Sequence, residues 1–167
     1  MILADADPPK EHSAQDRARP GRGGSKKRPP RATAAERRER IQVLWAKARA
    51  AERSARLLGE SGDFDGAANR AYYAAFSAAR AVLAGVRASL AESKGHSAIV
   101  RRFEKHFVQE RGLDPAFGRS FFGRLSHARW VADYDEARVD EMAARAMLGE
   151  AERFLATVEP FLKKAKA

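Results

Sequence analysis

Residues 68–86 read ANRAYYAAFSAARAVLAGV, a pattern typical of an amphipathic α-helix. Apolar side chains recur there every three or four residues and form one stripe, made up of Ala68, Tyr72, Phe76, Ala79, Leu83 and Val86. Several of these side chains are small, so neighbouring helices can approach closely. We expect the helix to begin after Asp63, whose carboxylate suits the N-cap position.

A longer helix is predicted before this segment. Thr33-Ala-Ala-Glu36 fits a capping box, in which the hydroxyl and the carboxylate each accept a hydrogen bond from an otherwise unpaired backbone N–H. An apolar stripe follows, made up of Ile41, Leu44, Ala48, Ala51, Ala55 and Leu58. Gly59 and Gly62 are expected to end this helix.

Three more helices are predicted after residue 86. The first of them is capped by Ser93 or a neighbour and ends at Gly112. Its side chains expected to face the core are Ile99, Val100, Phe103 and Phe107. Pro115 suits the first turn of the next helix, whose stripe is Phe117, Phe121, Leu125, Ala128 and Ala132. After a polar break, the last helix has the stripe Val139, Met142, Ala146, Phe154, Val158 and Phe161, and Pro160 is expected to kink or fray its final turn.

The sequence divides into two parts. No segment alternates apolar and polar residues between hairpin turns, so we expect residues 33–164 to form an all-α antiparallel bundle of four to five helices. Residues 1–32 hold five of the seven prolines and show no apolar periodicity, which predicts a disordered arm. The arm is basic, with Arg17, Arg19, Arg22, Lys26, Lys27, Arg28 and Arg31 uninterrupted by any acid. It either binds phosphates, releasing their counterions, or is a solvated tail.

Composition limits the classes of function. The chain has 167 residues, a formal charge of +10 and a pI of about 10.4, which favour an anionic partner. Without cysteine there is no disulfide, thiolate nucleophile or Cys-ligated metal, and the four histidines lack the spacing of a metal site, so no cofactor is expected. No apolar run approaches the roughly 20 residues of a membrane span. These features predict a cytoplasmic protein without a membrane partner.

Two segments carry candidate site residues. Arg129 and Asp133 are four positions apart, on one face of a predicted helix, where the simplest interpretation is an ion pair of about 0.2–0.5 kcal/mol. Tyr72 and Tyr73 are adjacent, so both cannot face the same core. Since Tyr72 lies on the apolar stripe, we assign Tyr73 to an interface or a polar cleft.

Three segments together resemble the HEPN-domain family. They are residues 71–83, which read AYYAAFSAARAVL; residues 94–100, KGHSAIV, followed by Phe103; and residues 129–134, RWVADY. Their order and spacing are most similar to a prokaryotic subfamily whose members end helix four in Arg-X-X-Ala-Asp-Tyr. The resemblance covers roughly residues 36–162, and residues 1–32 have no counterpart in it.

The resemblance implies a helical bundle that often forms a homodimer and is encoded beside a minimal nucleotidyltransferase as a toxin–antitoxin pair. Active members are metal-independent ribonucleases whose motif is an arginine, usually followed directly by a polar residue, and a histidine separated from the arginine by four to six residues. The arginine would stabilise phosphate charge, and the histidine would move a proton. Here Arg129 matches the arginine, Trp130 replaces the polar residue and Tyr134 takes the first histidine position. No histidine follows Arg129, which leaves His96 as the substitute.

Three functions are compatible with these observations. The first is an RNA- or nucleotide-binding module of a HEPN/nucleotidyltransferase toxin–antitoxin or defence pair, without robust cleavage. The second is a metal-independent ribonuclease toxin using Arg129 with Tyr134 or His96, and the third is a non-catalytic helical adaptor. The candidate catalytic residues are thus Arg129, Tyr134 and His96. The candidate binding residues are Asp133, Tyr73, Lys94, Arg17, Arg19, Arg22, Lys26, Lys27 and Arg28.

Overall fold

The structure, a computed structural model, describes residues 32–92 and 95–166. Five α-helices make up most of this part: α1 (Ala34–Glu60), α2 (Phe64–Val86), α3 (His96–Phe103), α4 (Arg119–Tyr134) and α5 (Glu141–Lys166). A 3₁₀ turn, η1 (Ala88–Ala91), precedes α3; a π-helical segment, η2 (Glu104–Gln109), extends it; and a 3₁₀ turn, η3 (Pro115–Phe117), leads into α4. These residues contain no strand, so the predicted all-α bundle is confirmed. The predicted arm lies outside the described residues, apart from Ala32.

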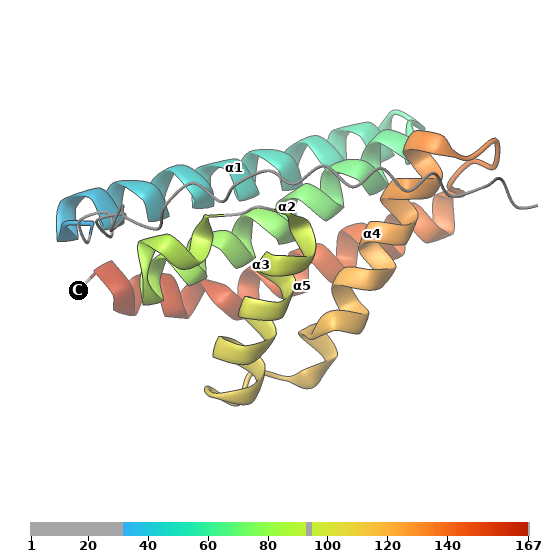
Figure 1. Ribbon diagram of the computed structural model, residues 1–167. Coiled ribbons are helices and arrows are strands. Elements are labelled where there is room, and N and C mark those ends of the chain that lie inside the picture. The colour runs from blue at the N-terminus through green and yellow to red at the C-terminus, as the bar shows by residue number, and fades with distance from the viewer. Residues whose placement is uncertain (1–31, 93–94, 167) are drawn as a thin grey trace, which may run out of the picture. The chain divides into compact units, whose positions relative to one another are not determined.

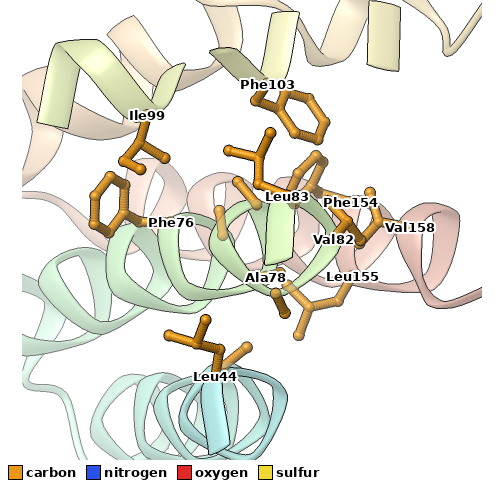
Figure 2. Packing of buried hydrophobic residues seen from close by; sticks show 14 of the residues in the cluster. Leu44, Phe76, Ala78, Val82, Leu83, Ile99, Phe103, Phe154, Leu155 and Val158 are labelled. Atoms are coloured by element: carbon orange, nitrogen blue, oxygen red, sulfur yellow. The ribbon is translucent and has the colours of Figure 1, made fainter. Parts of the chain in front are cut away.

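Helix α2 lies at the centre of the bundle and packs against α1, α4 and α5 (Figure 1). Helices α1 and α2 are antiparallel, whereas α5 runs beside α2 in the same direction, because α3 and α4 carry the chain back across the bundle. Figure 2 shows Leu44 of α1 on one side of α2 and Ile99 and Phe103 on the other. The many alanines of α2 are buried because helices contact it on several sides, which explains its small side chains.

The predicted helix ends are confirmed at three positions. Thr33 and Glu36 form the capping box, with the Thr33 backbone N–H donating to Glu36 Oε2 at 2.7 Å. Asp63 Oδ1 accepts a hydrogen bond from the backbone N–H of Gly66, in the first turn of α2, at 2.8 Å. Between α1 and α2, Gly62 has φ 83°, a left-handed conformation that glycine adopts without steric cost.

The third and fourth predicted helices differ from expectation in detail. The 3₁₀ turn η1 was not predicted. Gly95 takes the N-cap position of α3, whereas Ser93 lies outside the described residues. The end of α3 widens into the π-helical segment η2. Gly112, with φ 66°, ends this segment as predicted. Pro115 begins the 3₁₀ turn η3, so α4 starts only at Arg119.

The prediction of which side chains of α5 are buried is wrong at the start of this helix. Met142 is 80% exposed and Ala146 is also exposed, whereas Ala144 is buried. The backbone N–H of Val139 donates to Asp65 Oδ1 of α2 at 2.8 Å, and this contact with α2 fixes the angle at which α5 begins. The helix also continues through Pro160 as far as Lys166. Among the described residues, no helix is long and apolar enough to cross a membrane.

Candidate functional site

Arg129 and Asp133 form the predicted ion pair, and a residue from α2 joins them. Arg129 Nε donates to Asp133 Oδ2 at 3.0 Å, one turn further along α4. The other carboxylate oxygen, Oδ1, accepts from Asn69 Nδ2 of α2 at 2.6 Å. The carboxylate therefore links α4 to α2 and holds the guanidinium in one orientation.

Two tyrosines of α2 face the same guanidinium. Arg129 Cζ lies 5.6 Å from the ring centre of Tyr72 and 5.5 Å from that of Tyr73, within the range of a cation–π contact. Tyr73 is half-buried and also contacts Arg70, whose Cζ lies 5.9 Å from the ring centre. The pair is thus divided as expected, with Tyr72 in the core and Tyr73 at its edge.

His96, at the start of α3, contacts the buried tyrosine. The Tyr72 hydroxyl lies 2.6 Å from His96 Nδ1, and the Tyr72 side chain is only 1% exposed. The His96 ring centre is 4.5 Å from that of Phe76, which lies one turn further along α2. His96 therefore reaches the surroundings of Arg129 through Tyr72. We call these residues, Asn69, Tyr72, Tyr73, His96, Arg129 and Asp133, the Arg129 cluster.

Both groups of the Tyr72–His96 hydrogen bond are uncharged near neutral pH. Burial raises the pKa of Tyr72 to about 12, so its hydroxyl keeps its proton. Burial, and then the positive charges of Arg129 and Arg80, lower the pKa of His96. If the hydroxyl donates to Nδ1, Nε2 carries the ring proton and can donate to an anion; in the other tautomer Nε2 can accept a proton.

A groove of about 480 Å³ adjoins the Arg129 cluster. It is lined by residues of α2, α3 and α4: Tyr72, His96, Ser97, Val100, Arg101, Arg119, Phe122, Gly123 and Ser126. None of these side chains is acidic, and Tyr72 and His96 belong to both the groove and the cluster. The groove therefore offers cations and hydroxyls beside the fixed Arg129 guanidinium.

The structure does not bring Tyr134 to Arg129. They are five positions apart, which is about 140° around an ideal helix. The Tyr134 side chain is 70% exposed, and no hydrogen bond or ring contact joins it to the Arg129 cluster among the described residues. His127, two residues before Arg129, is exposed and stacks on Trp130 with ring centres 6.4 Å apart. His96 is therefore the one candidate proton carrier that the described part of the chain places near Arg129.

Several candidate residues lie outside the described residues. They are Lys94 and the cations of the arm, Arg17, Arg19, Arg22, Lys26, Lys27 and Arg28. Asn69, by contrast, was not predicted as a site residue. It precedes Tyr72 and Tyr73 by three and four positions, a spacing that places all three on one face of α2. The feature of the sequence that could have identified Asn69 is its position, one helical turn before two tyrosines.

A second, smaller cavity lies between α1, α2 and α5. Its volume is about 200 Å³, and its lining residues are Arg56, Gly59, Glu60, Phe64, Ala67, Ala144, Arg145 and Leu148. None of them belongs to the Arg129 cluster. Within the described part of the chain, no three His, Asp or Glu side chains are grouped closely enough to hold a metal ion.

Comparisons with known proteins agree on one family. The family model of the HEPN domain matches residues 41–161. A protein of Methanocaldococcus jannaschii, named as a putative toxin, is 32% identical over 127 residues, which is 76% of this chain and 92% of that protein. A Thermotoga maritima protein named UPF0332 is 30% identical over 131 residues, which is 77% of this chain and 96% of that protein.

Proposed function

Because this chain belongs to the HEPN family, we propose that it is an RNA- or nucleotide-binding module of a toxin–antitoxin or defence pair. One observation carries the proposal: the Arg129 guanidinium is fixed by Asp133 and two tyrosines beside a groove whose lining contains no acid. A fixed guanidinium suits a phosphate, since its planar N–H groups match two phosphate oxygens.

The Arg129 cluster has unused capacity for an anion. The hydrogen bond to Asp133 engages Nε, and the two terminal nitrogens of a guanidinium carry further N–H donors that can reach an anion. Asp133 offsets part of the positive charge, but one of its oxygens is also occupied by Asn69. His96 adds an N–H donor when Tyr72 donates to its Nδ1. A phosphate bridging Arg129 and His96 would then be held by charge and by hydrogen bonds together.

The partners are part of this proposal. Similarity to the protein named as a putative toxin supports a place in a toxin–antitoxin pair, and we propose a minimal nucleotidyltransferase as the second member. We further propose that the protein is a cytoplasmic homodimer and that residues 1–32 form a basic arm, separate from the bundle of residues 33–164, that adds phosphate contacts.

A second candidate function is metal-independent RNA cleavage. The observation that favours it is the position of His96, whose lowered pKa leaves the ring neutral and able to accept a proton near pH 7. The ring would take the proton of a 2′-hydroxyl, and the oxygen would attack the adjacent phosphorus. The bond from phosphorus to the 5′-oxygen would break, which leaves a 2′,3′-cyclic phosphate, and the 5′-oxygen would take a proton from water. Arg129 would stabilise the charge on the phosphate. Tyr134 has no role in this scheme.

The test of binding is the variant Arg129→Ala, compared with the wild type and with Arg53→Gln on α1. We expect Arg129→Ala to weaken binding of a labelled single-stranded RNA by about tenfold or more, the effect of losing a charged hydrogen bond. Arg53 is exposed and in no ion pair with a described residue, so its loss should change affinity little. The proposal is wrong if the wild type binds neither RNA nor AMP. If Arg129→Ala unfolds the bundle, the adaptor function is favoured instead.

The test of cleavage uses the same RNA in the presence of EDTA. We expect binding without robust cleavage, because no histidine follows Arg129 on α4. If the wild type does cleave RNA and either Arg129→Ala or His96→Ala abolishes cleavage, the ribonuclease function replaces the non-catalytic one. Tyr134→Phe is the matched control, since the Tyr134 side chain is 70% exposed and forms no hydrogen bond or ring contact with Arg129 or His96 among the described residues.

A further inference from the structure

We infer that the groove between α3 and α4 holds the sugar–phosphate backbone of single-stranded RNA, next to the phosphate bound at Arg129. The ligand is then a strand with at least two neighbouring phosphates, not a free mononucleotide. This inference rests on the proposed function and narrows the class of ligand from RNA or nucleotides to RNA strands. The groove is continuous with the Arg129 cluster, because Tyr72 and His96 belong both to the cluster and to the lining of the groove.

The charges of the groove suit a second phosphate. Arg101 is exposed, lines the groove and makes no ion pair with any described residue. Arg119 lies on the facing helix, where its guanidinium pairs with Glu104 of η2 just outside the lining. Arg101 is therefore the cation of this groove that an incoming anion can engage without first breaking an ion pair.

Gly123 leaves open space on α4 beside the groove. A glycine inside a helix destabilises it relative to alanine. A Cβ added at Gly123 would meet no atom within 4 Å, so packing does not require the glycine. Gly123 lines the groove, where the absent side chain keeps the space open and lets a ligand approach the backbone of α4.

The size and the remaining lining suit one nucleotide unit of a strand. A volume of about 480 Å³ lies within the range of small-ligand sites. Ser97 and Ser126 bring hydroxyls that can both donate to and accept from a sugar or a phosphate. Tyr72 and Phe122 are nearly fully buried, so the imidazole of His96 is the exposed aromatic ring that the groove offers to a base. Contact is therefore expected mainly with the backbone of the strand, with little preference for its sequence.

The first test compares Arg101→Gln with the wild type for two probes, a labelled eight-nucleotide oligoadenylate and AMP. We expect Arg101→Gln to weaken oligoadenylate binding by about tenfold, the loss typical of one charged hydrogen bond. The slope of log K against log salt should become shallower by about 0.7, as for one lost phosphate contact on a single strand. Binding of AMP should be unchanged, and Arg53→Gln should alter neither probe.

The second test uses two helical glycines, of which only Gly123 lines the groove. Gly123 of α4 and Gly149 of α5 both lie inside helices, and an added Cβ would meet no atom within 4 Å at either position. Changing either to Ala should raise Tm by about 2–4 °C, because helix propensity improves. Gly123→Ala, and more strongly Gly123→Gln, should weaken oligoadenylate binding, whereas Gly149→Ala and Gly149→Gln should not.

The outcomes separate this inference from the function on which it rests. If the wild type binds neither probe, the proposed function itself is wrong. If Arg129→Ala weakens oligoadenylate binding but the Arg101 and Gly123 variants bind like the wild type, the proposed function stands and the groove does not hold RNA. If those variants weaken AMP as much as oligoadenylate, the groove takes a free nucleotide and the inference of a strand is overturned.

Discussion

At the scale of single residues, Tyr72 connects the core of the bundle to the Arg129 cluster. Its ring packs against Phe76 and faces the guanidinium of Arg129, while its hydroxyl reaches His96. The ring therefore contributes to packing, and the hydroxyl positions the start of α3. The adjacent Tyr73 shares the contact with Arg129 but is only half-buried, and no hydrogen bond of its hydroxyl is observed among the described residues.

The two tyrosines allow a matched pair of substitutions. Tyr72→Phe removes the hydroxyl that pairs with His96 and should lower the free energy of unfolding by about 1 kcal/mol, the usual contribution of one hydrogen bond. Tyr73→Phe should leave stability nearly unchanged. Urea denaturation of the two variants and the wild type measures both effects. Equal losses for the two variants would contradict the role given to the Tyr72 hydroxyl.

The lowered pKa of His96 predicts a pH dependence of stability. The unfolded chain binds a proton at His96 at a higher pH than the folded chain does, so the folded state loses stability as pH falls below about 6.5. Between pH 8 and pH 5, Tm of the wild type should therefore fall more than Tm of His96→Gln. A parallel decrease in both proteins would show that other groups, and not His96, cause the acid sensitivity.

At the scale of elements, α2 supplies contacts to every layer of the bundle. Phe76 is 5% exposed and lies between Tyr72 and the His96 ring. Phe76→Ala should cost about 3–5 kcal/mol, the range for truncating an aromatic side chain in a packed core. Chemical denaturation followed by circular dichroism measures this loss. A variant that melts within about 2 °C of the wild type would place Phe76 outside the core.

The helices could be predicted where their apolar pattern is local. The stripe of α1 needs only the spacing from Ile41 to Leu58, and the capping box needs only Thr33 and Glu36. The start of α5 could not be predicted in the same way. Its orientation depends on the bond from Val139 to Asp65, which are 74 residues apart in the sequence, and that contact turns Met142 outward.

The candidate site shows the same division between local and distant contacts. The pair of Arg129 and Asp133 could be predicted, because i and i+4 are neighbours on any α-helix. Asn69 joins this pair from 64 residues away, so no local spacing identifies it. His96 was named only as a substitute for a missing histidine. Its approach to the cluster depends on how α3 packs across α2, which periodicity does not determine.

At the scale of the whole molecule, the formal charge of +10 is spread over two parts of the sequence. Seven cations fall between residues 17 and 31, and the α3–α4 groove adds Arg101 and Arg119. The two sets can act together on a polyanion, because phosphate contacts contribute to affinity without a requirement for sequence. The arm should then strengthen binding, and the cluster should determine where the RNA lies.

Deletion of residues 1–32 separates these contributions. The truncated chain keeps the capping box of Thr33 and Glu36, so its helical circular dichroism and Tm should match those of the full chain. Its affinity for single-stranded RNA should fall, and the salt dependence of binding should become shallower by about 0.7 for each lost phosphate contact. Unfolding of the truncated chain, or unchanged binding at every salt concentration, would refute the role of the arm.

The central claim is that RNA lies on the Arg129 cluster. Photo-crosslinking of the full chain to a single-stranded RNA containing 4-thiouridine, with the crosslinked peptides identified by mass spectrometry, tests it most directly. We expect crosslinks in peptides that contain Tyr73, His96 and Arg129, and their loss in Arg129→Ala. Crosslinks confined to α1 or α5, and unchanged in Arg129→Ala, would contradict it.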